Sequence, residues 1–200
     1  MSGLPVALDV SRETLEKLRA YEALVRKWNS KINLVAQGTL DDFSSRHIQD
    51  SIAIARATAM HGQWLDLGSG GGLPGIVVAI LADPERSVTL IESDGRKAAF
   101  LNTVRRELGL DLRVIPDRIE DVDPFAADVV SARALAPLPR LLELCVRHGH
   151  PRTRYILPKG RNWRQEVMEA EASWVYDVEI IESPVDPSSV ILKITNLDRA

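Results

Sequence analysis

The sequence has only one cysteine, Cys145, among its 200 residues. A single cysteine excludes an internal disulfide and fits a reducing compartment. The chain also lacks any apolar run near the roughly 20 residues that a membrane-spanning helix needs. Residues 1–10 contain neither the basic nor the apolar segment of a signal peptide. We therefore predict a cytoplasmic protein without a membrane partner.

Metal-ligand patterns are missing as well. The four histidines and the single cysteine do not combine with acids at the spacing of a metal site, so no metal is expected. The net charge of −3 and the apolar content of 45% indicate an ordinary globular chain with enough residues for one sizeable core. We expect residues 1–62 to form an N-terminal helical extension on an α/β core of residues 63–200, together one compact, monomeric domain.

The most informative feature present is the stretch Asp66–Gly72, which reads DLGSGGG between two apolar segments. Strand, glycine turn and helix in this order are typical of a nucleotide-cofactor loop at the carboxyl edge of a parallel sheet. Gly68, Gly70 and Gly72 permit positive φ and a close approach of the backbone to a ligand. A dinucleotide fingerprint requires glycine at position 73, where this chain has Leu73. The compressed spacing is instead that of S-adenosylmethionine sites in Rossmann-like methyltransferases.

Two acids complete this pattern. Asp66 can accept hydrogen bonds from the cofactor or from backbone donors. Glu92 ends the next expected strand 22 residues after Gly70, near the ~20-residue offset of a ribose-binding acid. We assign Glu92 and the adjacent Ser93 to the cofactor site. Because the same acids also suit NAD, a nicotinamide oxidoreductase is the rival class, which Leu73 disfavours.

From residue 64 the hydrophobic pattern alternates between strands and helices, which predicts a parallel sheet with helices on both faces. The expected strands are 64–67, 88–92, 112–115, 127–132, 154–158, 176–182 and 189–195, and the expected helices are 74–82, 95–108, 137–147 and 162–174. A turn alone joins the last two strands, so they should pair antiparallel. The predicted fold class is therefore α/β, a Rossmann-like class I methyltransferase with a seven-stranded, mostly parallel sheet ending in a C-terminal antiparallel hairpin.

Two helices are expected in the N-terminal extension. The first begins at its N-cap, Ser11, and continues in a helical hydrophobic pattern. The second is opened by Thr39 in a capping-box variant. It carries His47 and Asp50, whose spacing of three residues allows a hydrogen bond along one helix face. We expect Asn33, in the linker, to join this pair near the cofactor opening.

The region after the fourth expected strand carries the acceptor chemistry in this fold. Enzymes that methylate an amine place an Asp/Asn/Ser-Pro-Pro-aromatic motif there, whereas residues 131–134 read SARA. Methylation of a pyrimidine carbon needs a cysteine nucleophile, but Cys145 lies among leucines of an expected helix and is assigned to the core. The remaining acceptors are atoms that can be methylated without a covalent enzyme intermediate, such as guanine N7. The neighbouring O6 of the guanine could accept a hydrogen bond from Arg133 or Lys159.

Charge is uneven near the C-terminus. Residues 147–164 contain six Arg or Lys and no acid, whereas residues 165–192 contain seven acids and no Arg or Lys. A solvated face is the ordinary meaning of such a run. Beside a cofactor loop, the basic stretch is also a candidate surface for RNA phosphates. Both interpretations stand at this point.

Five segments together carry a specific resemblance: residues 33–34 (NL), 47–51 (HxxDS), 64–75 (WLDLGSGGGLPG), 131–138 (SARAxAPL) and 158–160 (PKG). In this order they are similar to the ribosomal RNA small subunit methyltransferase G family, also called glucose-inhibited division protein B. The resemblance extends from about residue 20 to the C-terminus. The combination of HxxDS with GLPG is far more specific than the glycine loop.

The resemblance implies transfer of a methyl group from S-adenosylmethionine, leaving S-adenosylhomocysteine. The implied acceptor is N7 of a guanine in the 530 loop of 16S rRNA, guanosine 527 in standard numbering. The rRNA would be presented as a 30S subunit or an assembly intermediate. The alternative is an RNA-binding or assembly factor that keeps the methyltransferase fold without transferring a methyl group.

Site residues follow from the same resemblance. Gly68 and Leu73 match the family's cofactor contacts, and Glu92 stands at the ribose position, where many members have Asp. The pair Ile119–Glu120 matches the residues that flank the adenine, and Arg133 matches the arginine between cofactor and substrate. Ala before this arginine departs from the usual Ser-Arg, which leaves the direction of Arg133 open. We expect positioning and substrate contacts, with no general base, from Arg133, Lys159, Asn33, His47 and Asp50.

Overall fold

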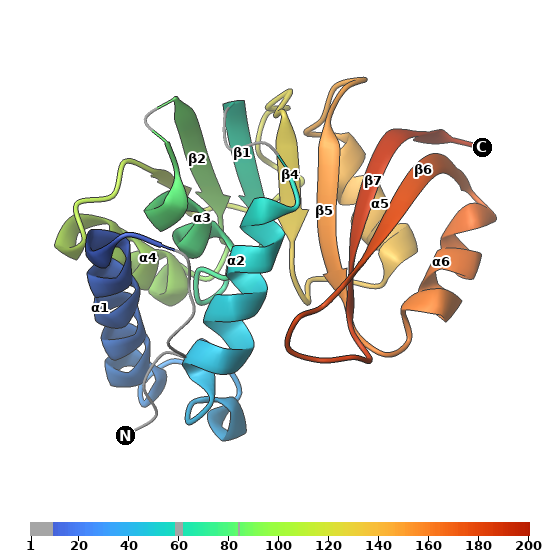
Figure 1. Cartoon of the computed structure of the whole chain (residues 1–200). Coiled ribbons are helices and arrows are strands. Elements are labelled where there is room, and N and C mark those ends of the chain that lie inside the picture. Colours follow the sequence, from blue (N-terminus) through green and yellow to red (C-terminus); the bar gives the residue numbers. More distant parts are fainter. Residues whose placement is uncertain (1–9, 59–61, 84) are drawn as a thin grey trace.

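The computed structural model in Figure 1 describes residues 10–58, 62–83 and 85–200. Expectations for residues 1–9 lie outside these ranges. Seven strands of the described chain form one sheet in the order β3-β2-β1-β4-β5-β7-β6. The strands are β1 (Gly62–Leu67), β2 (Arg86–Ile91), β3 (Arg113–Ile115), β4 (Val129–Ala132), β5 (Arg154–Lys159), β6 (Trp174–Glu182) and β7 (Val190–Arg199). Each expected strand is present, within a few residues of its expected bounds.

The strand directions confirm the predicted topology. β1 pairs in parallel with β2 and β4, β2 with β3, and β4 with β5. β7 is antiparallel to both of its neighbours, β5 and β6. β7 therefore lies between β5 and β6, although β6 precedes it in the chain.

Helices cover both faces of the sheet (Figure 1). They are α1 (Arg12–Asn29), α2 (Gln49–Arg56), α3 (Gly75–Leu81), α4 (Gly95–Glu107), α5 (Leu138–Val146) and α6 (Trp163–Glu171). Side chains alternate along each strand, so one strand supplies both hydrophobic layers. Trp64 of β1 packs in a cluster with α1 to α4, whereas Leu65 packs in a second cluster with α5 and α6. The N-terminal helices thus share a core with α3 and α4.

The first helix begins as predicted. The hydroxyl oxygen of Ser11 accepts a hydrogen bond from the backbone N–H of Thr14 at 3.1 Å, which satisfies one of the free donors of the first turn. A different helix, α4, shows the usual ending. Gly109 follows the C-terminus of α4 and adopts a φ of +60°, the usual role of glycine at this position.

The prediction for the second helix was wrong at its start. Thr39 ends a short 3-10 helix, η1 (Gln37–Thr39), and its hydroxyl donates to the carbonyl oxygen of Ala36 at 2.8 Å, so it does not cap the next helix. The following helix opens as a π-helical turn, η2 (Ser44–Ile48), and continues as α2. This π-helical turn contains His47, in keeping with the frequent location of such turns at functional sites.

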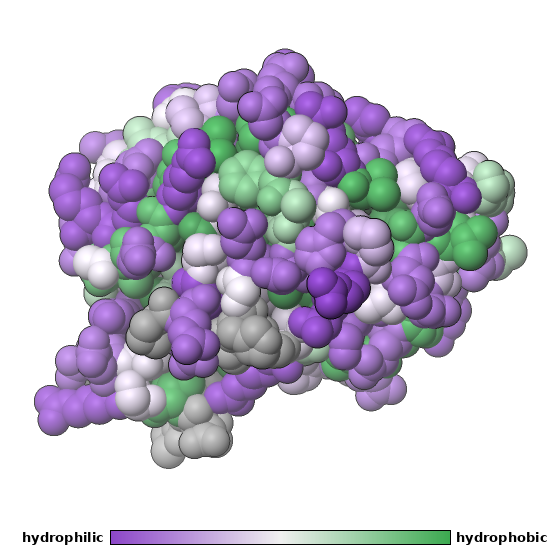
Figure 2. Space-filling model, turned by 90° about the horizontal axis from the view of Figure 1, so that it is seen from above, coloured by the Kyte–Doolittle hydropathy of each residue, from purple (hydrophilic) through white to green (hydrophobic). Residues whose placement is uncertain are grey.

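Figure 2 looks onto the edge of the sheet where the parallel strands begin, opposite the edge that carries the glycine loop. Hydrophilic residues dominate this face, and hydrophobic residues show in smaller areas between them. Within the described residues, no helix combines the length and the apolar character needed to cross a bilayer.

Candidate cofactor and acceptor site

The glycine loop connects β1 to α3. The backbone N–H of Ser69 donates to Ile91 of the neighbouring strand at 3.0 Å, and the N–H of Gly72 donates to the carbonyl of Ser69 at 2.7 Å. Gly70 and Gly72 have φ values of +56° and +92°, which L side chains rarely adopt. The glycine spacing therefore follows from the backbone path of the loop.

Asp66 lies under this loop and is only 1% exposed. One carboxylate oxygen accepts from the Ser131 hydroxyl at 2.6 Å, and the other accepts from the backbone N–H of Gly75 at 3.3 Å. The same Ser131 oxygen accepts from the indole N–H of Trp64 at 2.8 Å. Burial raises the pKa of Asp66 to about 6, against these hydrogen bonds. Asp66 thus joins β1, β4 and the start of α3.

The N-terminal extension supports the loop from its other side. Tyr21 is fully buried, and its hydroxyl donates to the carbonyl oxygen of Gly71 at 2.6 Å. Asn29, at the end of α1, accepts from the backbone N–H groups of Leu34 at 2.9 Å and Val35 at 3.0 Å. These contacts fix the linker against the loop. Neither Tyr21 nor Asn29 was identified from the sequence, where both looked like ordinary helix positions.

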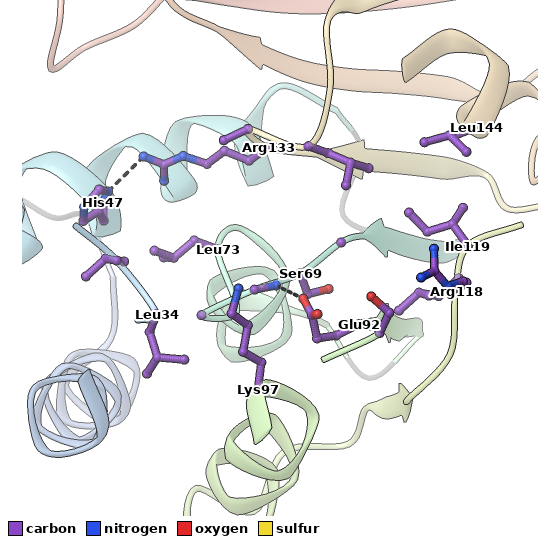
Figure 3. Close-up of a pocket in the computed structure, with 18 of the residues that line it drawn as sticks. Leu34, His47, Ser69, Leu73, Glu92, Lys97, Arg118, Ile119, Arg133 and Leu144 are labelled. Atoms are coloured by element: carbon purple, nitrogen blue, oxygen red, sulfur yellow. Dashed lines mark hydrogen bonds between the residues drawn. The ribbon is translucent and has the colours of Figure 1, made fainter. Parts of the chain in front are cut away.

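A cavity of about 640 Å³ opens between the loop, the linker and the carboxyl ends of β1, β2 and β4 (Figure 3). His47, Arg133 and most of the predicted cofactor residues line it. The cofactor residues are Gly68, Gly70, Leu73, Glu92, Ser93, Ile119 and Glu120. Ile119 and Leu144 lie at one end of the cavity, and His47 and Arg133 lie at the other end.

Five predicted residues lie elsewhere. Asp66 and Gly72 do not line the cavity; Asp66 holds the loop from within the core. Asn33 is exposed outside the cavity, so its expected place beside His47 was wrong. The buried Asn29 orders the linker instead. Asp50 and Lys159 line a second, adjoining cavity.

Glu92 lies on the cavity wall with both carboxylate oxygens engaged by backbone donors. Gly70 N–H donates to Oε2 at 2.7 Å, and Asp94 N–H donates to Oε1 at 2.8 Å. Figure 3 shows the carboxylate facing the glycine loop. A carboxylate has about four lone-pair sites, so Glu92 can still accept from hydroxyl groups of a ligand.

Two basic residues at the cavity were not foreseen. Lys97 comes from the first turn of α4, and Arg118 precedes Ile119. Lys97 sits beside the glycine loop, whereas Arg118 sits near the apolar end (Figure 3). Each occupies a position that the sequence alone assigns to an exposed helix turn or loop, and only the fold brings them to one opening.

Arg133 points from the end of β4 toward α2, which settles the direction left open by the sequence. Its Nη2 donates to Nδ1 of His47 at 2.9 Å. Because a guanidinium can only donate, Nδ1 must accept, and Nε2 must carry the proton that His47 donates to the Thr39 hydroxyl oxygen at 2.9 Å. Burial, with Arg133 and Arg46 nearby, lowers the pKa of His47 to about 4.

His47 and Asp50 do not bond directly, contrary to the prediction. Arg133 Nη2 lies between them, 3.7 Å from Oδ2 of Asp50. The other Asp50 oxygen accepts from the Ser183 hydroxyl at 3.2 Å. Burial raises the pKa of Asp50, and Arg133 opposes this shift. Nη1 of Arg133 is buried and has no hydrogen-bond partner among the described residues.

The second cavity, of about 890 Å³, shares Arg133, Ala134 and Leu135 with the first. Lys159 lines it, and the side chain of this lysine is only 8% exposed. Its ammonium donates to Glu166 at 2.7 Å and to the carbonyl of Ala136 at 2.9 Å. The two cavities therefore meet at Arg133, and Lys159 belongs to the second one.

The basic stretch 147–164 is not one surface. β5 runs through the middle of this stretch and separates its two ends. Arg154 lies at the start of β5, far from the glycine loop, and donates to the Thr58 hydroxyl at 3.2 Å. Lys159 ends β5 at the edge of the cavities. Arg164 follows in the first turn of α6, and its guanidinium stacks on Trp163 at 4.3 Å. Only the second half of the stretch can serve a ligand at the site.

The fold and the cavity define a class of protein. The chain resembles the crystal structure of a SAM dependent methyltransferase from Aquifex aeolicus at a TM-score of 0.62 and 14% identity, covering 78% of this chain and 95% of that one. It also resembles M. jannaschii TYW2 in complex with AdoMet at a TM-score of 0.59 and 16% identity, covering 86% of this chain and 80% of that one. The chain therefore has the Rossmann-like class I methyltransferase fold.

The sequence identifies the family. A family model described as rRNA small subunit methyltransferase G matches residues 14–186. Ribosomal RNA small subunit methyltransferase G of Ruegeria sp. (strain TM1040) is 48% identical over 195 residues, covering 96% of this chain and 95% of the relative. The protein of the same name from Cereibacter sphaeroides (strain ATCC 17025) is 51% identical over 192 residues, covering 94% and 92%. The chain belongs to the rRNA small subunit methyltransferase G family.

Proposed function

We propose that this chain transfers the methyl group of S-adenosylmethionine to N7 of a guanine in the 530 loop of 16S rRNA, at guanosine 527. The family membership supports the rRNA substrate. The guanine atom, the position and the form of the substrate, a 30S subunit or an assembly intermediate, belong to the proposal. One observation carries the choice of atom: the residue best placed to act as a base is not available as one.

That residue is His47. Its Nδ1 accepts from Arg133 and its Nε2 donates to Thr39, so both ring nitrogens are engaged. Its lowered pKa, about 4, also makes it a weak base at neutral pH. Cys145 is fully buried, and burial raises the pKa of its thiol, so it cannot serve as a nucleophile. A site of this kind suits an acceptor with a free lone pair that needs no proton removed.

The residues of the first cavity fit S-adenosylmethionine, which when bound supplies an activated methyl group. Glu92 keeps lone pairs for ribose hydroxyls, and the apolar side chains of Ile119 and Leu144 suit the faces of an adenine. Space is open above Gly70, where an added Cβ would meet no atom closer than 3.9 Å. Arg133, at the opposite end from Ile119, stands where cofactor and acceptor would meet.

Catalysis then consists mainly of positioning. In-line transfer to N7 requires the acceptor lone pair and the methyl carbon to be aligned, and well-oriented reactants can supply several kcal/mol of the barrier reduction. Arg133 borders both cavities and is held from one side by His47 and Asp50. Its buried Nη1 has a free donor for a bound ligand. Arg133 thus orients the two reactants relative to each other.

The deciding experiment is methyl transfer from methyl-labelled S-adenosylmethionine to naked 16S rRNA, 30S subunits and an assembly intermediate. Borohydride reduction and aniline cleavage break RNA at N7-methylguanine and map the modified position. We expect one modified guanine, in the 530 loop, and unequal rates on the three substrates. Label at another atom would overturn the proposed acceptor. Tight rRNA binding without any transfer would favour the assembly-factor alternative.

A further inference from the structure

The second cavity contains an ion pair that the proposed chemistry has not used. Lys159, from the end of β5, and Glu166, from α6, are 2.7 Å apart, and their side chains are 8% and 23% exposed. Glu166 also accepts from the backbone N–H of Leu138 at 2.8 Å, through the same oxygen. This carboxylate therefore fixes the lysine and the start of α5 at once.

The geometry leaves one donor of Lys159 for a ligand. An ammonium has three N–H groups, and two acceptors, Glu166 and the carbonyl of Ala136, contact Nζ within the described residues. The lysine lines the cavity, so its third N–H is available to a ligand there. The result is an N–H donor with a fixed position and a neutralised charge.

The charges around the second cavity disfavour a phosphate as its occupant. Both cations that line it are paired, Arg133 with Asp50 at 3.7 Å and Lys159 with Glu166 at 2.7 Å. A further carboxylate, Glu169, also lines the cavity and accepts only from Gln165 among the described residues. Three acids and two bases favour a group that is neutral or becomes positive.

A guanine methylated at N7 is such a group. The N7 lone pair forms the bond to the methyl carbon, and the C–S bond breaks with its electron pair going to sulfur. The sulfonium becomes a neutral thioether, the purine ring gains the positive charge, and no proton moves. An unpaired ammonium beside O6 would repel this developing charge, because two like charges a few ångströms apart in a partly buried site are only weakly screened by solvent.

We propose that the second cavity receives the acceptor base itself and that Glu166 is a positioning residue for it. Glu166 holds Lys159 so that its remaining N–H donates to the carbonyl oxygen O6, and it cancels the lysine charge as the ring becomes positive. This inference rests on the proposed function. It adds the location of the base, the group that recognises O6 and the reason for a buried carboxylate at that place.

The first test is single-turnover methyl transfer with Glu166→Gln. Glutamine keeps an oxygen for Lys159 and Leu138 but leaves the ammonium charge uncompensated. We expect the transfer rate constant to fall on the order of tenfold, while rRNA affinity is unchanged or tighter and cofactor affinity is unchanged. Glu171→Gln, which removes an exposed carboxylate from the end of the same helix, is the matched control and should transfer at the wild-type rate.

A rescue variant separates charge compensation from structural support. Lys159→Gln combined with Glu166→Gln restores neutrality and keeps an amide donor, so the double variant should transfer faster than Glu166→Gln alone. A carboxylate that only staples β5 to α6 would give a double variant no faster than the single one. A wild-type transfer rate in Glu166→Gln, or a double variant that is no faster than Glu166→Gln, would overturn the inference.

A second measurement does not depend on how Glu166→Gln folds. The target guanosine is replaced by 2-aminopurine riboside, which keeps N7 and lacks O6. Wild-type transfer should slow on this substrate, and Lys159→Met should slow little further from the same replacement, because each change removes the same hydrogen bond. Equal penalties for both proteins would contradict the O6 contact. If the wild type methylates no guanine N7 at all, the proposed function fails first, whereas N7 methylation with additive penalties removes this inference alone.

Discussion

Tyr21 donates a hydrogen bond to the carbonyl oxygen of Gly71 at 2.6 Å across fifty positions of the chain. The tyrosine belongs to the first helix of the N-terminal extension, and the glycine belongs to the cofactor loop. Leu34, in the linker, lies so close to the same glycine that an added Cβ would meet its carbonyl oxygen at 3.1 Å. The extension therefore helps to shape the cofactor loop.

Tyr21→Phe should weaken cofactor binding with little change in fold. The substitution leaves a buried carbonyl without its donor, at a cost of about 1–3 kcal/mol, and the loop can relax away from its binding geometry. We expect calorimetry to show S-adenosylhomocysteine binding roughly three- to tenfold weaker. Tyr176→Phe is the control, because the Tyr176 hydroxyl on β6 has no hydrogen-bond partner among the described residues. Equal affinity of Tyr21→Phe and wild type would contradict this role.

Gly70→Val should abolish cofactor binding. Gly70 has a φ of +56°, which strains a β-branched residue, and the space at its Cβ position opens toward the cavity. The wild type should bind S-adenosylhomocysteine and not NAD in the same calorimeter. Gly38→Val, at an exposed glycine with nothing within 4 Å of an added Cβ, provides the matched control. Binding of NAD in place of S-adenosylhomocysteine would restore the oxidoreductase interpretation.

The pH–rate profile of methyl transfer should be nearly flat between about pH 7 and 9, because N7 needs no general base. His47 is the side chain best placed to cause a pH-dependent limb in this profile, but its lowered pKa of about 4 keeps it neutral throughout this range. Single-turnover rates on rRNA measure the chemical step directly. A steep limb that disappears in His47→Gln would show that the histidine moves a proton.

Stability should depend on His47 in acid. Its folded pKa is lowered from 6.5 to about 4, so the unfolded chain takes up this proton first as the pH falls. The histidine therefore contributes stability above about pH 6.5 that declines progressively toward pH 4, by about 2 kcal/mol after a discount for its partial exposure. Asp66, with a pKa raised to about 6, acts in the opposite sense over the same range.

The His47 contribution is measured as a difference. Urea unfolding of wild type and His47→Gln at several pH values gives the difference in free energy of unfolding, from which the Asp66 contribution cancels. The wild type should lose stability relative to the variant between pH 7 and 4.5. A pH-independent difference would mean that the histidine is not held neutral in the folded chain.

Arg161 and Arg164 should contribute to rRNA binding. They lie next to the second cavity, whereas the first half of the basic stretch lies at the other edge of the sheet. Arg161→Ala with Arg164→Ala should weaken rRNA binding and flatten its salt dependence by about one unit of slope for each phosphate that these arginines neutralise. Cofactor affinity should not change. Arg105→Ala with Arg106→Ala, exposed at the end of α4, removes the same charge elsewhere. Equal effects of the two double variants would mean that the basic stretch is an ordinary solvated face and not an rRNA-binding surface.

Local patterns sufficed for the fold because they report local physics. Glycine spacing indicated the loop between β1 and α3, and the alternation of strand and helix segments along the chain located strands whose two faces pack in different clusters. The start of the second helix could not be predicted in this way. Thr39 has the right type for a cap, but its hydroxyl is engaged by Ala36 and His47, and the second of these contacts is tertiary.

Site residues that belong to a sequence motif could be predicted. Site residues that only tertiary contacts bring to the site could not. Glu92 and Arg133 were found from their place after a strand. Tyr21, Asn29 and Glu166 contribute instead through hydrogen bonds to Gly71, Leu34 and Lys159, and no periodicity in the sequence marks such bonds. Asn33 was predicted because it belongs to a recognisable segment, but it is exposed, whereas Asn29 is buried.

The position of β7 between β5 and β6 has a consequence for synthesis. A chain emerging from the ribosome makes β6 before β7, the one strand of the described chain that pairs with it, so β6 must wait with both edges open until β7 is made. Val190, the first residue of β7, and the preceding Ser189 both line the second cavity. A chain that lacks β7 therefore lacks part of the wall of the second cavity, and this cavity is complete only once β7 has joined the sheet.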